Sequence, residues 1–353
     1  MTEKYLMKGN EALAEAAIRS GCHHFFGYPI TPQTEISAYM AKRMPKIGGT
    51  FLQAESEVAA INMVLGAASA GVRAMTSSSS PGISLKSEGV SYIAASDLPC
   101  VIVNVMRGGP GLGGIQPSQS DYWQATKALG HGDFQLLVFA PSSVQEMVDL
   151  TFRAFDRADH YRMPALILAD GMLGQMMEPV SFPDDIGDNL PPKPWATNGT
   201  QGKRPHNIIN SLILQPDELE RIVQERYRRY EVVKQNEVLV ETYRTDDADI
   251  FVTAYGATAR IAKSAVNEAR KQGVKAGLIR PITLWPFPSD CFARYAEQAR
   301  VMLSVEMSMG QMVEDVRLAV QGRCPVAFYG RTGGMIPTPK EVLAQILQLA
   351  QTK

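Results

Sequence analysis

Residues 72–105, VRAMTSSSSPGISLKSEGVSYIAASDLPCVIVNV, carry the pattern that decides the fold. Short apolar runs at 72–77 and 100–105 predict strands, and the spacing of apolar residues over 83–95 predicts a helix between them. Two strands joined by a helix lie parallel, because the helix returns the chain to the edge at which the first strand began. We therefore expect a parallel sheet with helices on both faces.

The same alternation continues on both sides of this unit. Toward the N-terminus and up to residue 168 we expect helices at 10–20, 56–70 and 143–158, and strands at 24–28, 50–53, 134–139 and 164–168. A smaller copy follows, with strands at 250–254, 274–279, 301–305 and 326–329, and helices at 258–272, 289–298, 309–320 and 339–349. The prediction is an α/β protein with two doubly wound domains, residues 1–180 and 248–353.

The segment between the two domains, residues 181–247, has a different composition. Residues 183–207 are rich in Pro, Gly and Asn, which predicts an exposed meander. Residues 216–243 are highly charged and carry periodic Leu, Ile, Val and Tyr. This pattern predicts one solvated helix that bridges the domains.

Composition excludes several classes of protein. The 353 residues are 45% apolar and 20% charged, with a net charge of -1, so no broad electrostatic field favours nucleic acid or an anionic membrane. The start of the sequence contains acidic residues and no apolar run, which is unlike a signal peptide or a membrane anchor. We expect a cytoplasmic enzyme or binding protein.

The cysteines argue against a metal cluster in this chain. Cys22, Cys100, Cys291 and Cys324 are far apart in the sequence, whereas iron–sulfur clusters and structural zinc use cysteines at short spacings. Scattered cysteines are usually small buried apolar residues. We expect no metal ligands here, and if the enzyme moves electrons, the clusters belong to another chain.

The loop Gly27-Tyr28-Pro29-Ile30-Thr31-Pro32 follows a predicted strand. Its two prolines restrict the backbone, and the C-terminal ends of strands are where open α/β sheets bind ligands. Thr31 would be its exposed hydrogen-bonding side chain. The alternative is a plain turn into a helix that has Pro32 at its first position.

Glu57 precedes the apolar run VAAINMVLGAASAG. The run is apolar almost all round, which predicts a buried helix with Glu57 in its first turn. A carboxylate there either benefits from the helix dipole or, if buried, needs a partner or a function. Glu55 fits the exposed, capping interpretation better.

A glycine-rich loop, Arg107 to Gly114, follows the strand at 100–105. It lacks the Lys-Ser/Thr of a phosphate-binding loop. Arg107 at the strand end could bind a carboxylate through two parallel hydrogen bonds, although a solvated loop arginine is equally compatible with the sequence. Asp121 could position Arg107 or a water.

Together these motifs resemble a known family. The loop at 27–32, the helix from Glu57 to Gly66, Ser80-Pro81-Gly82, Leu98-Pro99 followed by Arg107, and residues 305–311 occur in the order found in the alpha subunit of 2-oxoacid:ferredoxin oxidoreductases. The resemblance covers essentially the whole chain. It is greatest to the type that acts on 3-methyl-2-oxobutanoate (2-ketoisovalerate) and next to the 2-oxoglutarate type.

The resemblance implies roles for particular residues and domains. Residues 1–180 would be a pyrimidine-binding domain of thiamine-diphosphate enzymes, and 248–353 a transketolase C-terminal-like domain. Glu57 would be the catalytic residue that hydrogen-bonds N1′ of the cofactor, and Tyr28, Pro29 and Ile30 would contact the cofactor. Thr31 and Arg107 would bind the oxo and carboxylate groups of the substrate. Many relatives have two serines where this chain has Gln33-Thr34, so hydroxyl contacts there are not carried over.

The resemblance also implies an assembly. The chain would help to oxidatively decarboxylate a 2-oxoacid, with coenzyme A taking the acyl group and ferredoxin the electrons. A beta subunit would hold the diphosphate and its magnesium, and iron–sulfur and gamma subunits would complete the complex. The alternatives are a transketolase-like transfer without an external electron acceptor, and a scaffold subunit without catalytic residues.

Overall fold

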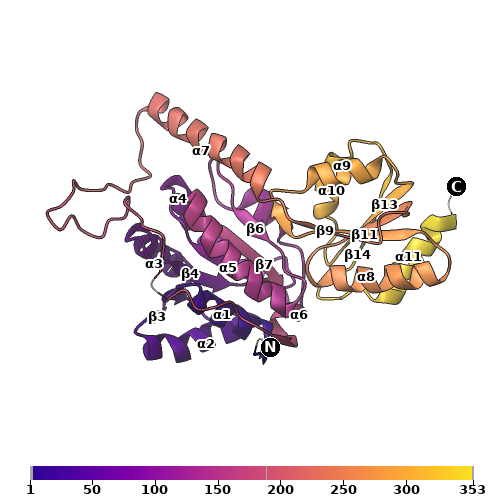
Figure 1. The fold of residues 1–353 in the computed structure, drawn as a ribbon, viewed down its shortest axis with the longest axis horizontal. Helices are drawn as coiled ribbons and strands as arrows, with labels where there is room; N and C mark the ends of the chain where they lie inside the picture. Colours follow the sequence, from indigo (N-terminus) through magenta and orange to yellow (C-terminus); the bar gives the residue numbers. More distant parts are fainter. Residues whose placement is uncertain (1–2, 188, 352–353) are drawn as a thin grey trace.

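A computed structural model describes residues 3–187 and 189–351 and shows two sheets side by side (Figure 1). The larger sheet has seven strands in the order β12-β6-β7-β5-β4-β2-β3. In chain order its strands are β2 (His24–Gly27), β3 (Thr50–Gln53), β4 (Ala74–Ser78), β5 (Val101–Met106), β6 (Leu137–Phe139), β7 (Ala165–Asp170) and β12 (Thr283–Trp285). All neighbouring pairs are parallel except β12 with β6.

The larger sheet is covered on both faces, as expected. On β5, Val101, Val103 and Val105 belong to a core with α1 (Gly9–Arg19), α2 (Thr34–Arg43) and α5 (Val144–Tyr161). The alternate residues Ile102 and Met106 belong to the core with α3 (Glu57–Ser69) and α4 (Ser80–Ala95). Because successive strand residues point to opposite faces, this division places one helical layer on each side.

The smaller sheet has the order β14-β13-β10-β11-β9. Its strands are β9 (Val240–Tyr243), β10 (Ile250–Thr253), β11 (Ala276–Pro281), β13 (Val301–Glu306) and β14 (Val326–Gly330), and its helices are α8 (Gly256–Lys271), α9 (Ser289–Ala296), α10 (Met312–Val320) and α11 (Pro339–Gln351). Four strands are parallel, and β9 pairs antiparallel with β11. Both doubly wound sheets of the prediction are therefore present.

Short elements complete the described chain. The strands β1 (Tyr5–Lys8) and β8 (Met177–Val180) form an antiparallel pair, and α6 (Gly171–Gln175) follows β7. A 3-10 turn spans Met44–Ile47 and a π-helical turn spans Gln124–Ala128. No helix of the described residues is both long enough and apolar enough to span a membrane.

The expected single helix over 216–243 is wrong at its C-terminal end. The helix α7 spans Pro216–Asn236, and the chain then enters β9. The residues of β9 are Val-Glu-Thr-Tyr, and three of the four are β-branched or aromatic. Such residues favour a strand over a helix end, and here they pair with β11. The helix is also anchored rather than fully solvated, because Arg226 donates to Asp97 Oδ1 at 3.0 Å and Tyr230 is buried.

Two strands belong to a sheet that is formed mainly by a different segment of the sequence. β9, from the connecting segment, completes the smaller sheet, and β12, which lies beyond residue 248, pairs with β6 in the larger sheet. The antiparallel edges formed in this way arise from long-range pairing, which local periodicity does not record. The domain boundaries at 180 and 248 remain predictions.

Gln119 joins the two sheets. It is fully buried, and its amide nitrogen donates to Tyr255 O at 2.8 Å, while its Oε1 accepts from Met307 N at 3.0 Å and from Thr258 Oγ1 at 2.8 Å. Its main-chain N–H also donates to Met307 O at 2.9 Å. All these partners lie on the smaller-sheet side, so Gln119 is one of the side chains that join the two sheets.

Glu306 explains part of the sequence motif at 305–311. It is fully buried at the end of β13, and its carboxylate accepts from Ser304 Oγ, Ser308 Oγ and the main-chain N–H groups of residues 311–313, at 2.9–3.1 Å. These N–H groups are the unsatisfied donors at the start of α10. Glu306 is thus a buried helix cap beside the junction, and every lone-pair direction of its carboxylate has a protein partner.

Candidate functional site

Four neighbouring strands end at one edge of the larger sheet. In the order β5-β4-β2-β3, their C-terminal ends are followed by Arg107, by Ser79 and Ser80, by the loop at 28–33, and by Glu57. Parallel strands end on the same side, so these segments share one edge. The candidate residues from four separate stretches of sequence are gathered there.

Glu57 is the first residue of α3 and is 6% exposed. The preceding Ser56 is the helix cap, since its hydroxyl accepts from Ala59 N at 3.2 Å, so the capping role expected for the exposed Glu55 is wrong. Within the described residues, the Glu57 carboxylate accepts no hydrogen bond. Although the residue is almost fully buried, its carboxylate is unpaired and is therefore free to accept from an external donor.

The Glu57 carboxylate lies against the start of α4. A Cβ placed on Gly82 would lie 2.6 Å from Glu57 Oε1 and 2.1 Å from Ser78 Oγ. The hydroxyls of Ser78 and Ser79 are buried and have no hydrogen-bond partner within the described residues. Glycine at position 82 therefore leaves the space in which the carboxylate sits, beside further unsatisfied polar atoms.

The helix α3 is not buried all round, contrary to expectation. Val58 is 44% exposed, and Asn62 and Gly66, one and two turns further, are exposed as well. Ile61 and Val64 on the opposite side are fully buried. The residues 58, 62 and 66 form one open stripe, because residues four apart share a face of a helix. This stripe begins next to Glu57.

The loop Tyr28 to Gln33 is not the first turn of a helix. Pro32 precedes α2, which begins at Thr34, so the alternative with Pro32 at the first helical position is wrong. Tyr28 and Pro29 are exposed and Ile30 is half-buried. The side chain of Thr31 is exposed and has no hydrogen bond within the described residues, whereas its main-chain oxygen accepts from Arg107.

Gln33 supports this loop from below. It is fully buried, its amide nitrogen donates to Tyr28 O at 3.2 Å, and its Oε1 accepts from Ser77 Oγ at 2.5 Å and from Ser37 Oγ at 3.3 Å. Gln33 thus ties the loop after β2 to the end of β4. Both acceptor positions of the Gln33 side-chain oxygen are therefore used within the protein, and none remains for a substrate.

Arg107 follows β5 and is 8% exposed. Its guanidinium donates to Thr31 O at 3.0 Å and to Leu112 O at 3.2 Å, so it connects the two loops predicted to bind substrate. Its Nε is buried and has no partner within the described residues. A guanidinium has five N–H donors, so three remain for a ligand.

Asp121 does not contact the Arg107 side chain. Its carboxylate accepts from Ser80 Oγ at 2.6 Å and from Asn104 Nδ2 at 2.9 Å, and Ser80 Oγ accepts in turn from Arg107 N at 3.0 Å. Burial raises the pKa of Asp121, while the hydrogen bonds from Ser80 and Asn104 oppose that rise. Asp121 therefore holds the main chain of Arg107 through Ser80.

Lys86 was not expected at this site. It lies on α4, is fully buried, and its Nζ donates to the main-chain oxygen of Glu57 at 3.5 Å. In the sequence it stands between Leu85 and Ser87 and looks like an ordinary helix-surface lysine. Only the packing of α3 on α4 shows that it points inward.

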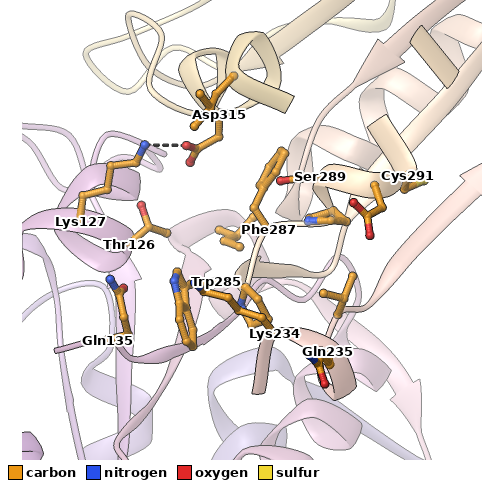
Figure 2. A pocket seen from close by; sticks show the side chains of 16 residues that line it. Thr126, Lys127, Gln135, Lys234, Gln235, Trp285, Phe287, Ser289, Cys291 and Asp315 are labelled. Atoms are coloured by element: carbon orange, nitrogen blue, oxygen red, sulfur yellow. Dashed lines mark hydrogen bonds and ion pairs between the residues drawn. The ribbon is translucent and has the colours of Figure 1, made fainter. Parts of the chain in front are cut away.

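A cavity of about 840 Å³ lies elsewhere, at the junction of the sheets near the end of α7. Trp285 and Phe287 line it, and Figure 2 shows Lys127 pointing toward Asp315 at its rim, where the two form an ion pair at 2.5 Å. Glu57 and Arg107 are not among its lining residues. The candidate site is instead an open edge bordered by loops.

The cysteines are separate and mostly buried. Cys22, Cys100 and Cys324 are buried and Cys291 is partly exposed, and burial raises the pKa of both Cys22 and Cys100 to about 12. These two thiols stay protonated at neutral pH, as expected of small apolar core residues. Within the described residues, no group of three or more His, Cys, Asp or Glu could hold a metal ion.

Known proteins with the same sequence features are oxidoreductases. Residues 15–255 match the family described as "Pyruvate flavodoxin/ferredoxin oxidoreductase, thiamine diP-bdg", and residues 248–342 match "Pyruvate:ferredoxin oxidoreductase core domain II". The ketoisovalerate oxidoreductase subunit VorB of Methanothermobacter thermautotrophicus is 49% identical over 98% of this chain and 97% of its own. The 2-oxoglutarate synthase subunit KorA of Methanothermobacter marburgensis is 39% identical over 98% of this chain and 99% of its own.

Solved structures agree on the fold. A 2-oxoglutarate:ferredoxin oxidoreductase from Magnetococcus marinus, with 2-oxoglutarate, coenzyme A and succinyl-CoA bound, superposes with a TM-score of 0.88 at 26% identity. The match covers 99% of this chain and 66% of that one. A split-gene transketolase, solved as an inactive beta4 tetramer, superposes with a TM-score of 0.60 at 12% identity over 98% of this chain and 99% of its own, which shows a shared fold.

These matches define the class as thiamine-diphosphate-binding oxidoreductases. The chain belongs to the pyruvate flavodoxin/ferredoxin oxidoreductase family, as a 2-oxoacid:ferredoxin oxidoreductase subunit. The resemblance noted from the motifs and the α/β fold expected from it are confirmed.

Proposed function

We propose that this chain supplies the half of a thiamine-diphosphate site that activates the cofactor's aminopyrimidine ring, in an enzyme that oxidatively decarboxylates 3-methyl-2-oxobutanoate. The observation that carries the proposal is the Glu57 carboxylate, buried at the shared strand edge and without a hydrogen bond from any described residue. A ring nitrogen that shares a proton with it would satisfy this group.

The residues at the edge fit such a cofactor. The buried and unpartnered hydroxyls of Ser78 and Ser79 and the space above Gly82 lie beside Glu57. Tyr28, Pro29 and Ile30 would border the ring from the loop after β2. If bound here, thiamine diphosphate would supply the carbanion chemistry needed at the oxo carbon of the substrate. Glu57 holds a proton at the ring nitrogen, and Arg107 and Thr31 orient the oxoacid.

The rest of the active site is assigned to partner subunits. A beta subunit would hold the diphosphate and magnesium, iron–sulfur and gamma subunits would carry electrons toward ferredoxin, and coenzyme A would accept the acyl group. The open stripe of α3 at residues 58, 62 and 66 begins beside Glu57 and leaves room for a partner subunit next to the site. The expected setting is the cytoplasm.

The apolar character of the Arg107 loop favours a branched aliphatic substrate. Leu112 is 86% and Ile115 is 58% exposed, and within residues 27–34 and 107–121 Arg107 is the one lysine or arginine. The second carboxylate of 2-oxoglutarate needs a second cation, because an unpaired charge is costly to desolvate. The 49% identity to the ketoisovalerate oxidoreductase subunit supports the same choice.

A panel of 2-oxoacids tests the function. The purified complex, assayed by reduction of a viologen dye with coenzyme A present, is expected to show a kcat/KM for 3-methyl-2-oxobutanoate that is about tenfold or more above that for 2-oxoglutarate. A preference for 2-oxoglutarate would reject the substrate assignment. Turnover without any external electron acceptor would favour a transketolase-like transfer, and wild-type turnover of a Glu57→Gln complex would favour a scaffold subunit.

Gly82→Ala is expected to lower turnover of the complex by about tenfold, because the added methyl group displaces the Glu57 carboxylate by several tenths of an ångström. The melting temperature of the chain should also fall, because the methyl group would lie 2.1 Å from the buried Ser78 Oγ as well. Steady-state kinetics and circular dichroism measure the two effects. Glu88→Ala, on the exposed side of the same helix, is the matched control. Wild-type turnover by Gly82→Ala would show that the carboxylate position is unimportant.

A further inference from the structure

Lys86 belongs to the face of α4 that packs on α3. Gly82, Lys86 and Gly89 are spaced four and three residues apart and so lie on one side of the helix. A Cβ on Gly82 would meet Glu57 Oε1 at 2.6 Å, and a Cβ on Gly89 would meet Ile61 Cγ2 at 2.5 Å. The two glycines bring the helices close together, and the long side chain of Lys86 is enclosed between them with no exposed surface.

The ammonium group of Lys86 has few compensating contacts. Its one hydrogen bond within the described residues is the 3.5 Å contact to Glu57 O, a long bond to a neutral acceptor. Burial lowers the pKa of Lys86 to about 8, and the negative charge of Glu57 opposes this fall. Carboxylates on nearby elements are engaged elsewhere: Glu88 accepts from Tyr92, and Asp121 accepts from Ser80 and Asn104.

A buried lysine in this position calls for a reason other than stability. Placing an ammonium in the interior costs free energy that an apolar side chain of similar volume would not cost. The attraction between Lys86 and Glu57 is mutual, so the ammonium stabilises the negative charge on Glu57 as much as Glu57 stabilises the ammonium.

We propose that Lys86 is a positioning residue for Glu57: it holds the main chain at the start of α3 and stabilises the ionised carboxylate, so that the shared proton moves toward the cofactor ring nitrogen. The proposal rests on the proposed function of Glu57. It concerns a charge on this chain, and it therefore has consequences for the protein even without cofactor or partner subunits.

The first test measures the stability of the full-length chain. Lys86→Met is expected to raise the melting temperature at pH 7, because the folded-state pKa of Lys86 lies below that of the unfolded chain and the buried cation is unfavourable at pH values below about 8. This gain should shrink as the pH rises from about 8 toward 10, where the wild-type lysine loses its proton in the folded state. Lys42→Met, at an exposed position on α2, should show neither effect.

The same measurement tests the pairing with Glu57. Glu57→Gln should lower the melting temperature more in the wild-type chain than in the Lys86→Met chain, since only the wild type has a buried ammonium left without its counter-charge. Equal shifts in the two backgrounds would overturn the electrostatic coupling. If Lys86→Met does not fold, the comparison is made with Lys86→Gln, which also removes the charge.

The second test uses the assembled complex and its pH profile. Turnover of the wild type should fall as the pH rises through about 8, because Lys86 loses its proton. Lys86→Arg keeps the charge and should move this fall to higher pH, whereas Lys86→Met should lower kcat by about tenfold at pH 7, remove the fall, and leave the KM for the oxoacid unchanged. A purely structural lysine would produce no such shift in Lys86→Arg.

The outcomes separate this proposal from the function of Glu57. An inactive Glu57→Gln together with a Lys86→Met that matches wild type in turnover and pH profile would overturn the role of Lys86 alone. Near-normal turnover of Glu57→Gln would reject the role of Glu57, and the role of Lys86 would go with it. A more stable but slower Lys86→Met supports both.

Discussion

Replacing Glu57 by Gln is expected to lower the kcat of the assembled complex by about 100- to 10,000-fold, the range typical of losing a general acid or base. The amide keeps the volume and the hydrogen-bonding ability of the carboxyl group but cannot take up or release a proton at neutral pH. Because Glu57 is 6% exposed and accepts no hydrogen bond from the described residues, the isosteric change leaves its packing intact. Viologen-linked turnover measures the loss, and calorimetric titration shows that thiamine diphosphate still binds.

Glu55→Gln is the matched control for this variant. Glu55 lies two residues earlier in the chain, is exposed, and undergoes the same chemical change. It should keep the turnover of the wild type. A Glu57→Gln complex that works as fast as Glu55→Gln would remove Glu57 from the mechanism and leave the chain as a scaffold for its partner.

Replacing Arg107 by Ala is expected to raise the KM for the oxoacid by about 100-fold, with a smaller effect on kcat. Hydrogen bonds between charged groups each contribute about 1.5–3 kcal/mol, and a bidentate pair to the substrate carboxylate would be lost. Arg107 has three N–H donors left after its bonds to Thr31 O and Leu112 O, which is enough for such a pair. Initial-rate kinetics over a range of oxoacid concentrations give both constants.

The Arg107 variants must also separate substrate binding from loop support. Arg107→Lys keeps the positive charge but not the planar pair of N–H donors, so it should retain only part of the affinity for the oxoacid. Arg317→Ala, at an exposed position on α10, should leave the KM unchanged. If Arg107→Ala lowers the melting temperature while the KM stays at the wild-type value, the arginine serves only to connect the loops at Thr31 and Leu112.

The larger features of the fold could be predicted from the sequence because they depend on local periodicity. The strand expected at 50–53 agrees with β3, and the helix expected after it agrees with α3, whereas α2 between β2 and β3 was not predicted. Glu57 could be singled out for the same reason, since an acidic residue directly before an apolar helical run stands at a helix start. That Glu57 is buried becomes clear only from the packing of α3 on the sheet.

Other features depend on residues that are distant in the sequence. Nothing in the local pattern distinguishes Lys86 from a surface lysine, because its burial results from the close approach of α3 at Gly82 and Gly89. Gln33 likewise reads as a loop amide, although it is buried against Ser77. The open stripe on α3 was missed for the opposite reason. A helix that is apolar on almost all sides is predicted to be buried, and the sequence does not show whether its own chain or another chain would bury it.

Strand exchange between the two halves has a practical consequence for dissecting this protein. A cut between residues 247 and 248 would separate β9 from β11 and β12 from β6. Each fragment would then contain one strand without a partner and one sheet with a bare edge, and such edges promote aggregation. A cut at this point is therefore unsuited to the separate expression of the two sheets.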